Sequence, residues 1–377
     1  MEELIAVRRS IHQHPELSFQ EHQTSQLLQN SLLSKGLPAS ALVSCASPGF
    51  YADITGTGPA APQSLCIALR AELDALAMQE ESLSLPYRSE VAGVAHMCGH
   101  DGHMSILLGT AWALLAQTQE IPSNCRVRLL FQLGEEKPPG GAKLMIEQGC
   151  LEGVDEIYAL HCGKAGLGTA ICLDSATTSF SSVLSVTISG EKCILAGAEV
   201  IMQLSTLVPR QVTCFEAAVL SLGSVHTACE SSGSPREMAI KGTIRVFSQE
   251  VFSRISLQIH TLVLSISSLY DCNPLITIQE GYPATINHPL HAHYLRTAIT
   301  RALGPESLVF DSPSSASEDF SRYLQRKPGA LMMLGNGNNV PHRTNFQFIE
   351  DNLRLGIRVW LALLEDRLGV GLSSELV

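Results

Sequence analysis

Short apolar runs alternate with helix-period segments in the first part of this 377-residue chain. Residues 65–69 (LCIAL) form a continuous apolar run, which is typical of a strand buried on both faces. Residues 102–117 then place apolar side chains at helical spacing, and strand-like runs follow at 126–133 and 156–161. This order predicts an α/β fold, with a mostly parallel sheet and helices on both of its faces.

The pattern changes between residues 175 and 285, after a connection rich in serine and threonine. Here the expected elements are strands at 183–188, 217–225, 239–247 and 274–279 and helices at 196–211 and 249–269. The resulting β-α-β-β-α-β order is typical of a ferredoxin-like α+β domain. The α/β pattern then resumes, with expected helices at 291–303, 317–326 and 351–367 and a strand at 330–334. We therefore predict a discontinuous catalytic domain (1–174 and 286–377) that is interrupted by an inserted domain (175–285).

The composition excludes several classes of protein. With 45% hydrophobic and 16% charged residues the chain can form a globular core, and its net charge of −11 disfavours nucleic acid as a partner. No apolar run approaches the roughly 20 residues of a membrane span, and the N-terminal segment lacks a signal-peptide pattern. The 11 cysteines form no C-x-x-C pair. Together these features predict a reduced, cytoplasmic protein without a membrane partner.

The densest group of metal-ligand side chains is the octapeptide HMCGHDGH, which starts at His96 and directly precedes the expected helix. Cys98 and His100 are two residues apart, so both can face one side of an extended turn. Asp101 is expected to cap or support the helix, and His96 and His103 to have structural or supporting roles. The alternative is a buried cysteine and a surface histidine beside a capped helix.

Three further segments place ligand-type side chains after expected strands. Glu135 and Glu136 follow the run at 126–133, His161 ends the run at 156–161, and His342 follows the strand at 330–334 and a glycine- and asparagine-rich loop. Taken singly, the acidic pair is also compatible with an exposed turn, and a lone histidine after a strand is usually structural. Because ligands collect beyond the carboxyl ends of strands in such sheets, their convergence favours one shared site.

The number of donors favours two metal ions over one. A single catalytic zinc ion takes three protein ligands, whereas five donors are available here: Cys98, His100, Glu136, His161 and His342. Two divalent ions that share a water fit better, and the adjacent Glu135 suits a general base. A mixed cysteine, histidine and glutamate ligand set suits Zn, Mn, Co or Ni.

The chain resembles the amidohydrolases of the aminoacylase/carboxypeptidase metallopeptidase family, which includes hippurate hydrolases and indole-acetyl-amino-acid hydrolases. The resemblance covers nearly the whole chain, and its segments are RRSIHQHPELSFQEH, ALRAELDAL, VAHMCGHDGHMSILLGTA, FQLGEEKPPGGAKLMIEQG, SEDFSRYLQRKPGALMMLGNGN and PHRTNFQF. It implies the same five metal ligands, with Glu135 as the base that activates water and then protonates the leaving amine. It also implies an N-acyl amino acid substrate and an inserted domain that serves as a lid and forms a homodimer.

The expected lid departs from the family pattern. Family members follow the first lid strand with a Gly-His-Ala segment, whose histidine helps to stabilise the developing oxyanion. Here residues 189–197 read SGEKCILAG, and the segment is shorter than in the family. An asparagine expected before the next lid strand is missing from residues 228–235, and His226 is the only nearby histidine.

The predicted function is metal-dependent hydrolysis of the amide bond of N-acyl amino acids, or of related small amides or dipeptides, by a water that two metal ions activate. The departures in the lid motivate an alternative, a catalytically impaired homologue that binds metal and ligand.

Overall fold

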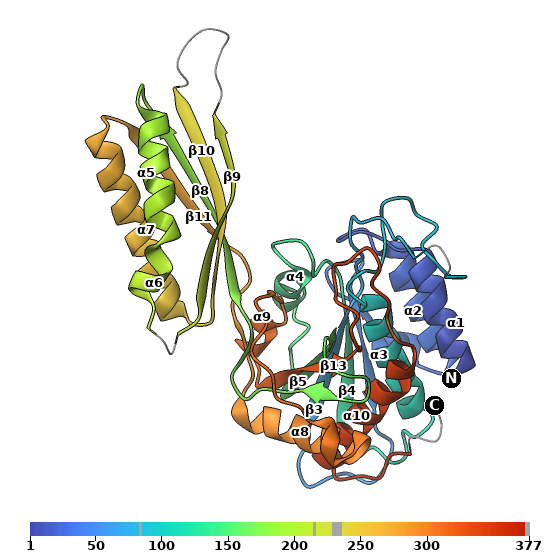
Figure 1. Ribbon diagram of the computed structural model, residues 1–377. Helices are drawn as coiled ribbons and strands as arrows, with labels where there is room; N and C mark the ends of the chain where they lie inside the picture. The colour runs from blue at the N-terminus through green and yellow to red at the C-terminus, as the bar shows by residue number, and fades with distance from the viewer. Residues whose placement is uncertain (83–84, 214–215, 228–235, 374–377) are drawn as a thin grey trace. The chain divides into compact units, whose positions relative to one another are not determined.

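The computed structural model of the chain describes residues 1–82, 85–213, 216–227 and 236–373, and it divides into two compact units (Figure 1). Unit 1 comprises Met1–Thr177, Ile286–Ser312 and Asp319–Val377, and unit 2 comprises Thr178–Thr285 and Pro313–Glu318. The inclusion of Pro313–Glu318 in unit 2 was not predicted. It follows from backbone pairing, since Thr178 bridges Ser314 and the Ser179 amide donates to the Ala316 carbonyl at 2.8 Å.

Unit 1 is built on a seven-stranded sheet in the order β1-β2-β4-β3-β5-β13-β6. Its strands are β1 (Leu42–Ser44), β2 (Phe50–Thr55), β3 (Cys66–Glu72), β4 (Arg126–Gln132), β5 (Glu156–Gly163), β6 (Ala170–Ile171) and β13 (Gly329–Gly335). The four central strands β4, β3, β5 and β13 pair in parallel, and the antiparallel pairs lie at the two edges. The prediction of a mostly parallel sheet is therefore confirmed.

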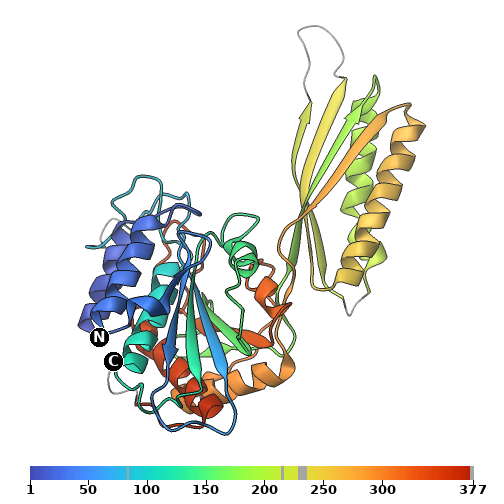
Figure 2. The ribbon, with the colours of Figure 1, turned by 180° about the vertical axis from the view of Figure 1, so that it is seen from behind.

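Helices cover both faces of this sheet, as predicted (Figures 1 and 2). One face packs against α1 (Glu2–Gln13), α2 (His22–Ser34), α3 (His100–Leu115), α8 (Pro289–Leu303) and α10 (Asp351–Leu368). The other face packs against α4 (Gly141–Glu147) and α9 (Ser321–Leu324). Every residue of β3 is buried because its side chains alternate between these two cores: Ile67 and Leu69 enter the first, and Ala68 enters the second.

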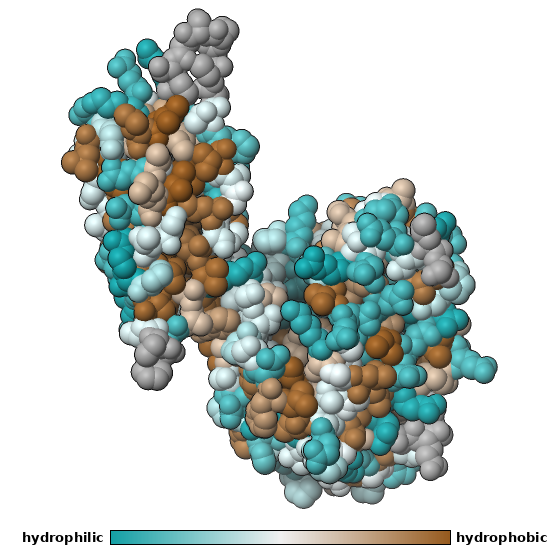
Figure 3. All heavy atoms as spheres, in the orientation of Figure 1, coloured by the Kyte–Doolittle hydropathy of each residue, from teal (hydrophilic) through white to brown (hydrophobic). Residues whose placement is uncertain are grey.

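Unit 2 has the predicted β-α-β-β-α-β order. Its strands are β8 (Phe180–Ser189), β9 (Ala218–Thr227), β10 (Glu237–Val246) and β11 (Asn273–Glu280), which form an antiparallel sheet in the order β11-β8-β10-β9. Its helices α5 (Cys193–Ser205), α6 (Leu207–Gln211) and α7 (Gln249–Leu269) cover one face of that sheet. Apolar side chains also reach the surface over α5 and α7 (Figure 3).

Two predicted helices were wrong in extent. The helix expected at 196–211 is divided at Thr206, because Pro209 has no amide hydrogen to donate to the Ser205 carbonyl. The helix expected at 317–326 is reduced to the four residues of α9, because the preceding residues 313–318 belong to unit 2. The remaining short elements are η1 (Ala39–Ala41), η2 (Pro305–Ser307), β7 (Ala176–Thr178) and β12 (Thr285–Ile286), the last two paired with each other. In the described ranges, no helix combines the length and apolarity needed to cross a membrane.

Candidate metal centre

The five predicted ligands lie together beyond the carboxyl ends of the central strands. Cys98 Sγ is 3.2 Å from His161 Nε2 and 3.3 Å from His342 Nε2. Glu136 Oε1 is 3.1 Å from His342 Nε2 and 3.9 Å from His100 Nε2. The ligand atoms form overlapping groups within 4.8 Å, namely Cys98–His100–His161, Cys98–Glu136–His342 and His100–Glu135–Glu136. Cys98 is common to the first two groups, and Glu135 belongs to the third.

The backbone at two of these positions is unusual. Gly99, between Cys98 and His100, has φ 89°, and a Cβ there would lie 2.6 Å from the Cys162 sulfur. A glycine is therefore required both for the turn and for the close packing behind it. His342 has φ 62°, which is rare for a non-glycine residue, and its amide donates to the Met97 carbonyl at 2.8 Å. This bond ties the loop after β13 to the turn that carries Cys98.

Hydrogen bonds to backbone carbonyls orient two of the imidazoles. His100 Nδ1 lies 2.8 Å from the Asp74 carbonyl, and His161 Nδ1 lies 2.7 Å from the Cys162 carbonyl. A carbonyl only accepts, so in each ring Nδ1 carries a hydrogen and Nε2 is left to face the centre. His100 Nε2 is buried and makes no hydrogen bond to any described residue. Histidines that bind metal are oriented in this way, so the pair fits a cation between them.

The electrostatics of the centre also favour a cation. Burial raises the pKa of the Cys98 thiol well above its usual range, and the nearby Glu136 adds to the effect. Burial alone lowers the pKa of His100, but the hydrogen bond that the ring donates to Asp74 and the charges of Glu72, Asp74 and Glu136 raise it to about 10. The surrounding carboxylates thus stabilise positive charge at this position, and a nearby divalent cation favours the thiolate form of cysteine.

The three remaining acidic and imidazole groups of the octapeptide have other roles. His103 donates from Nδ1 to Glu72 Oε2 at 2.9 Å and accepts at Nε2 from the Cys162 amide at 2.9 Å, so neither nitrogen is available to a metal. Burial lowers the pKa of His103 to about 4, which keeps it neutral. Asp101 does not cap α3, which begins without a side-chain cap. Instead it accepts hydrogen bonds from α1. His96 is fully buried.

The Glu135–Glu136 loop is held by two of its backbone amides, those of Gly134 and Glu136. The Gly134 amide donates to Glu21 Oε1 at 2.7 Å, and the Glu136 amide donates to Asp74 Oδ2 at 2.9 Å. Glu135 as a whole residue is only 5% exposed, whereas the His342 side chain is 51% exposed. The centre therefore opens to solvent at His342, with the candidate base inside.

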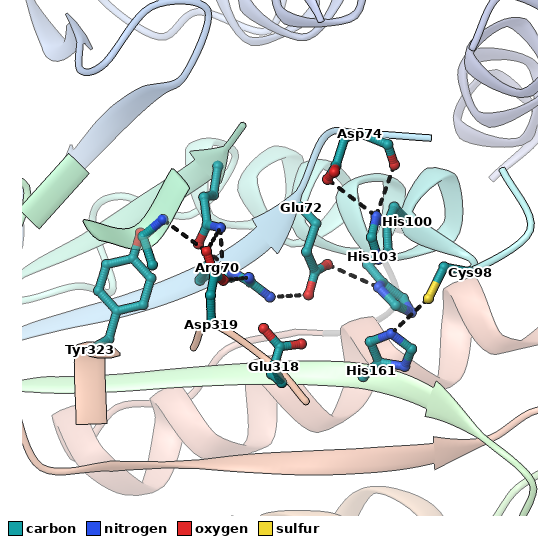
Figure 4. A network of polar contacts seen from close by, with 12 residues as sticks. Arg70, Glu72, Asp74, Cys98, His100, His103, His161, Glu318, Asp319 and Tyr323 are labelled. Atoms are coloured by element: carbon teal, nitrogen blue, oxygen red, sulfur yellow. Dashed lines mark hydrogen bonds and ion pairs between the residues drawn. The ribbon is translucent and has the colours of Figure 1, made fainter. Parts of the chain in front are cut away.

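The charged residues that surround this centre were not predicted from the sequence. Arg70, Glu72 and Asp74 lie on or directly after β3, and all are buried behind the ligands (Figure 4). A signal was present, because three charges in the segment ALRAELDAL would be unusual in a strand buried on both faces unless they were paired. Asp319, which pairs with Arg70, and His12, which contacts Asp101, had no comparable local signal in the sequence.

Two of the three segments of unit 2 that depart from the family pattern lie within the described residues. Residues 190–192 form a turn, and α5 starts at Cys193, so helix begins within the segment where the family has Gly-His-Ala. His226 is exposed on β9, where it pairs with Ala239. Residues 228–235, where the asparagine was expected, lie outside the described residues.

The fold and the centre define a metal-dependent hydrolase of amide bonds. The chain belongs to the peptidase family M20/M25/M40, whose family model matches residues 68–366. It is 32% identical to an N-acetyl-L-cysteine deacetylase of Bacillus subtilis, over 92% of this chain and 84% of the relative. It is 31% identical to the IAA-amino acid hydrolase ILR1-like 4 of Arabidopsis thaliana, over 94% of this chain and 83% of the relative.

A solved structure of similar fold is the YXEP protein of Bacillus subtilis, described as a dinuclear metal binding peptidase from the M20 family. It superimposes with a TM-score of 0.85 at 26% identity and covers 98% of this chain and 99% of that chain. The predicted resemblance to the family is therefore confirmed.

Proposed function

We propose that the protein hydrolyses the amide bond of N-acyl amino acids, or of related small amides or dipeptides, with two divalent cations as cofactors. The convergence of five ligand-type side chains around Cys98, with Glu135 beside them, carries this proposal. The ligands would be Cys98, His100, Glu136, His161 and His342. When bound, such cations polarise an amide carbonyl and lower the pKa of a water molecule.

The side chains of the centre have two proposed roles, metal binding and proton transfer. His100 and His161 would each bind through Nε2, because Nδ1 of each ring is engaged by a carbonyl. Glu135, buried and within 4.8 Å of its neighbours in the centre, would accept the proton of the attacking water. It would then deliver that proton to the nitrogen of the departing amine. Since the same carboxyl group acts twice, it must be ionised before attack and protonated afterwards.

The substrate class rests on the relatives. Two of them are named for the removal of an acyl group from an amino acid or for the hydrolysis of an amino acid conjugate. Their names support an N-acyl amino acid as substrate, and the choice among acetyl, benzoyl and indole-acyl groups is a matter for assay. The alternative of a binding protein without turnover is less well supported, because Glu135, the proposed base, lies in one group with His100 and Glu136.

The first test replaces Glu135 with glutamine, which keeps the shape of the side chain and removes its basicity. We expect turnover of a panel of N-acyl amino acids and dipeptides to fall by about 10²–10⁴-fold, with metal content unchanged. Glu120→Gln, at an exposed position, is the matched control and should retain full activity. Undiminished hydrolysis by Glu135→Gln would show that another group is the base, and vigorous hydrolysis by the wild type would exclude the binding-only alternative.

We also infer that unit 2 forms the contact of a homodimer. In support, α5 exposes Ile194, Leu195 and Met202, and α7 exposes Leu257, Leu264 and Leu269. Exposed apolar side chains gathered on neighbouring elements are typical of protein interfaces. The mass of the protein in solution tests this inference.

A further inference from the structure

A second set of buried polar side chains, three charged and one a neutral imidazole, lies directly behind the metal centre (Figure 4). Arg70 and Glu72 are on β3, His103 is on α3, and Asp319 lies just before α9. Each of the four is at most 1% exposed. None of them belongs to the proposed ligand set, so their burial calls for a separate explanation.

These four residues form a continuous series of contacts, which we call the buried ionic chain. Arg70 Nη2 donates to Asp319 Oδ1 at 2.7 Å, and Arg70 Nη1 donates to Glu72 Oε1. The second oxygen of Glu72 accepts from His103 Nδ1 at 2.9 Å. His103 Nε2 in turn accepts from the Cys162 amide at 2.9 Å. The series thus runs from Asp319 to the residue that follows the proposed ligand His161.

The Asp319 end of the chain holds the loop that carries the proposed base. The Asp319 carboxylate accepts two hydrogen bonds from Gln132 Nε2, at 2.9 and 2.8 Å, and one from the Ala142 amide at 3.0 Å. Gln132 is the last residue of β4, and Ala142 is the second residue of α4. One buried carboxylate therefore fixes both ends of the loop 133–140, in which Glu135 and Glu136 lie.

The His103 end holds the end of β5. Because the Cys162 amide donates to His103 Nε2, His103 must be the tautomer with hydrogen on Nδ1, which Glu72 accepts. The ring centroids of His103 and His161 are 4.6 Å apart, so a shift of the His103 ring would displace the proposed ligand His161 directly. The buried ionic chain therefore contacts, from behind, both the loop that carries Glu135 and Glu136 and the end of β5 that carries His161.

Stability alone does not account for this arrangement. Transferring two carboxylates and a guanidinium from water to the interior carries a large desolvation penalty, and apolar residues of similar volume are often as stable or more stable. The buried ionic chain instead fixes the orientation of the groups that it contacts, because a guanidinium and a carboxylate bind only at particular angles. Outer groups that orient metal ligands typically change metal affinity or activity 10–100-fold when they are mutated.

We propose that Asp319, Arg70, Glu72 and His103 are positioning residues that set the His161 end of β5 and the Glu135–Glu136 loop in the arrangement that binds metal. The proposal rests on the proposed function only in its choice of ligands and base. It extends that function by assigning a positioning task to four buried residues outside the proposed ligands and base.

The test compares two variants with a matched control. His103→Phe keeps a ring of similar shape and removes both hydrogen bonds, and Asp319→Asn keeps the shape of the carboxylate. The control is Asp53→Asn, which weakens a paired carboxylate of the same unit, since Arg128 donates to both Asp53 oxygens at 2.7 Å. His103→Asn, which retains a donor for Glu72, is a conservative variant for use if His103→Phe does not fold.

Three readouts separate positioning from structure: urea stability of the metal-free protein, the dissociation constant for Co(II), and the electronic absorption spectrum of the Co(II) protein. We expect His103→Phe and Asp319→Asn to weaken Co(II) binding by about 10–100-fold and to change the spectrum. We expect Asp53→Asn to lose stability while its Co(II) affinity and spectrum remain those of the wild type. His103→Asn should lie between His103→Phe and the wild type in Co(II) affinity.

The opposite result overturns the proposal. The buried ionic chain is purely structural if His103→Phe and Asp319→Asn lose only stability and keep the wild-type Co(II) affinity and spectrum. Where one of these variants does not fold, the same result for His103→Asn leads to the same conclusion. Failure of the proposed function would look different, since the wild type would then bind Co(II) but hydrolyse no member of the substrate panel.

Discussion

Replacing His12 with glutamine tests how a buried imidazole on α1 stabilises unit 1. His12 Nδ1 is 2.9 Å from Asp101 Oδ2, and its Nε2 is 3.4 Å from Glu80 Oε1. Because a carboxylate faces each nitrogen, the ring is best satisfied when both nitrogens carry hydrogen. Burial alone lowers the pKa of His12, but the hydrogen bond and charge of Asp101 and the hydrogen bond of Glu80 outweigh it and raise the pKa to about 9.

The magnitude follows from the difference between the folded and unfolded pKa values. The ordinary value is 6.5, so a folded value of about 9 corresponds to about 3 kcal/mol of stability. The sign follows from proton uptake, because the folded state binds the proton more tightly than the unfolded state. The stabilisation is therefore fully present below pH 6.5 and is lost as the pH rises to about 9.

Urea unfolding followed by tryptophan fluorescence is a suitable assay. The chain has two tryptophans, Trp112 and Trp360, and both lie in unit 1, so the signal reports on this unit. With metal removed by a chelator, the stability gap between wild type and His12→Gln should be about 3 kcal/mol larger near pH 6 than near pH 9.5. His14→Gln, at a 56% exposed position just after the same helix, is the control and should show no such change. A gap for His12→Gln that is independent of pH would refute the reasoning.

Two further predictions concern packing and assembly. Gly102→Ala would place a Cβ 2.3 Å from the Phe348 ring, so unit 1 should lose about 1–3 kcal/mol in urea unfolding, whereas Gly371→Ala, with nothing within 4 Å of the added carbon, should change nothing. Light scattering should give the mass of a dimer, and replacing the exposed Met202 and Leu257 together with glutamate should give that of a monomer with the metal content unchanged. If the double glutamate variant remained a dimer, the dimer interface would lie elsewhere on the protein.

The convergence of the five proposed ligands was predictable because each of them follows a strand or precedes a helix and is recognisable by residue type. Glu136 and His161 illustrate this, since each lies at or just beyond the carboxyl end of a central parallel strand. Parallel strands bring such ends together, so the sheet order converts separated motifs into one site. Strand and helix periodicity likewise predicted the order of elements in unit 2, although not the division of its first helix at Thr206.

The groups that support the site were not predictable in the same way. Asp101 meets Arg8 across 93 residues, and Arg70 meets Asp319 across 249 residues. No local spacing rule connects such positions, because the pairing depends on how α1 and the segment before α9 pack on the sheet. Their side chains also gave conflicting local signals: Asp101 at the start of a helix is typical of a cap, whereas the structure uses it to bind α1.

The proposed ligands and the departures from the family pattern lie in different units, and this separation allows them to be tested apart. All five proposed ligands and Glu135 belong to unit 1, whereas the segment that lacks Gly-His-Ala belongs to unit 2, which has its own core. A missing oxyanion donor weakens transition-state stabilisation, typically by about 10²–10³ in kcat, without changing the affinity for metal. A protein that binds two cations tightly but hydrolyses slowly would therefore assign the deficit to unit 2. Weak binding of cations would instead assign it to unit 1 and to the buried ionic chain behind the centre.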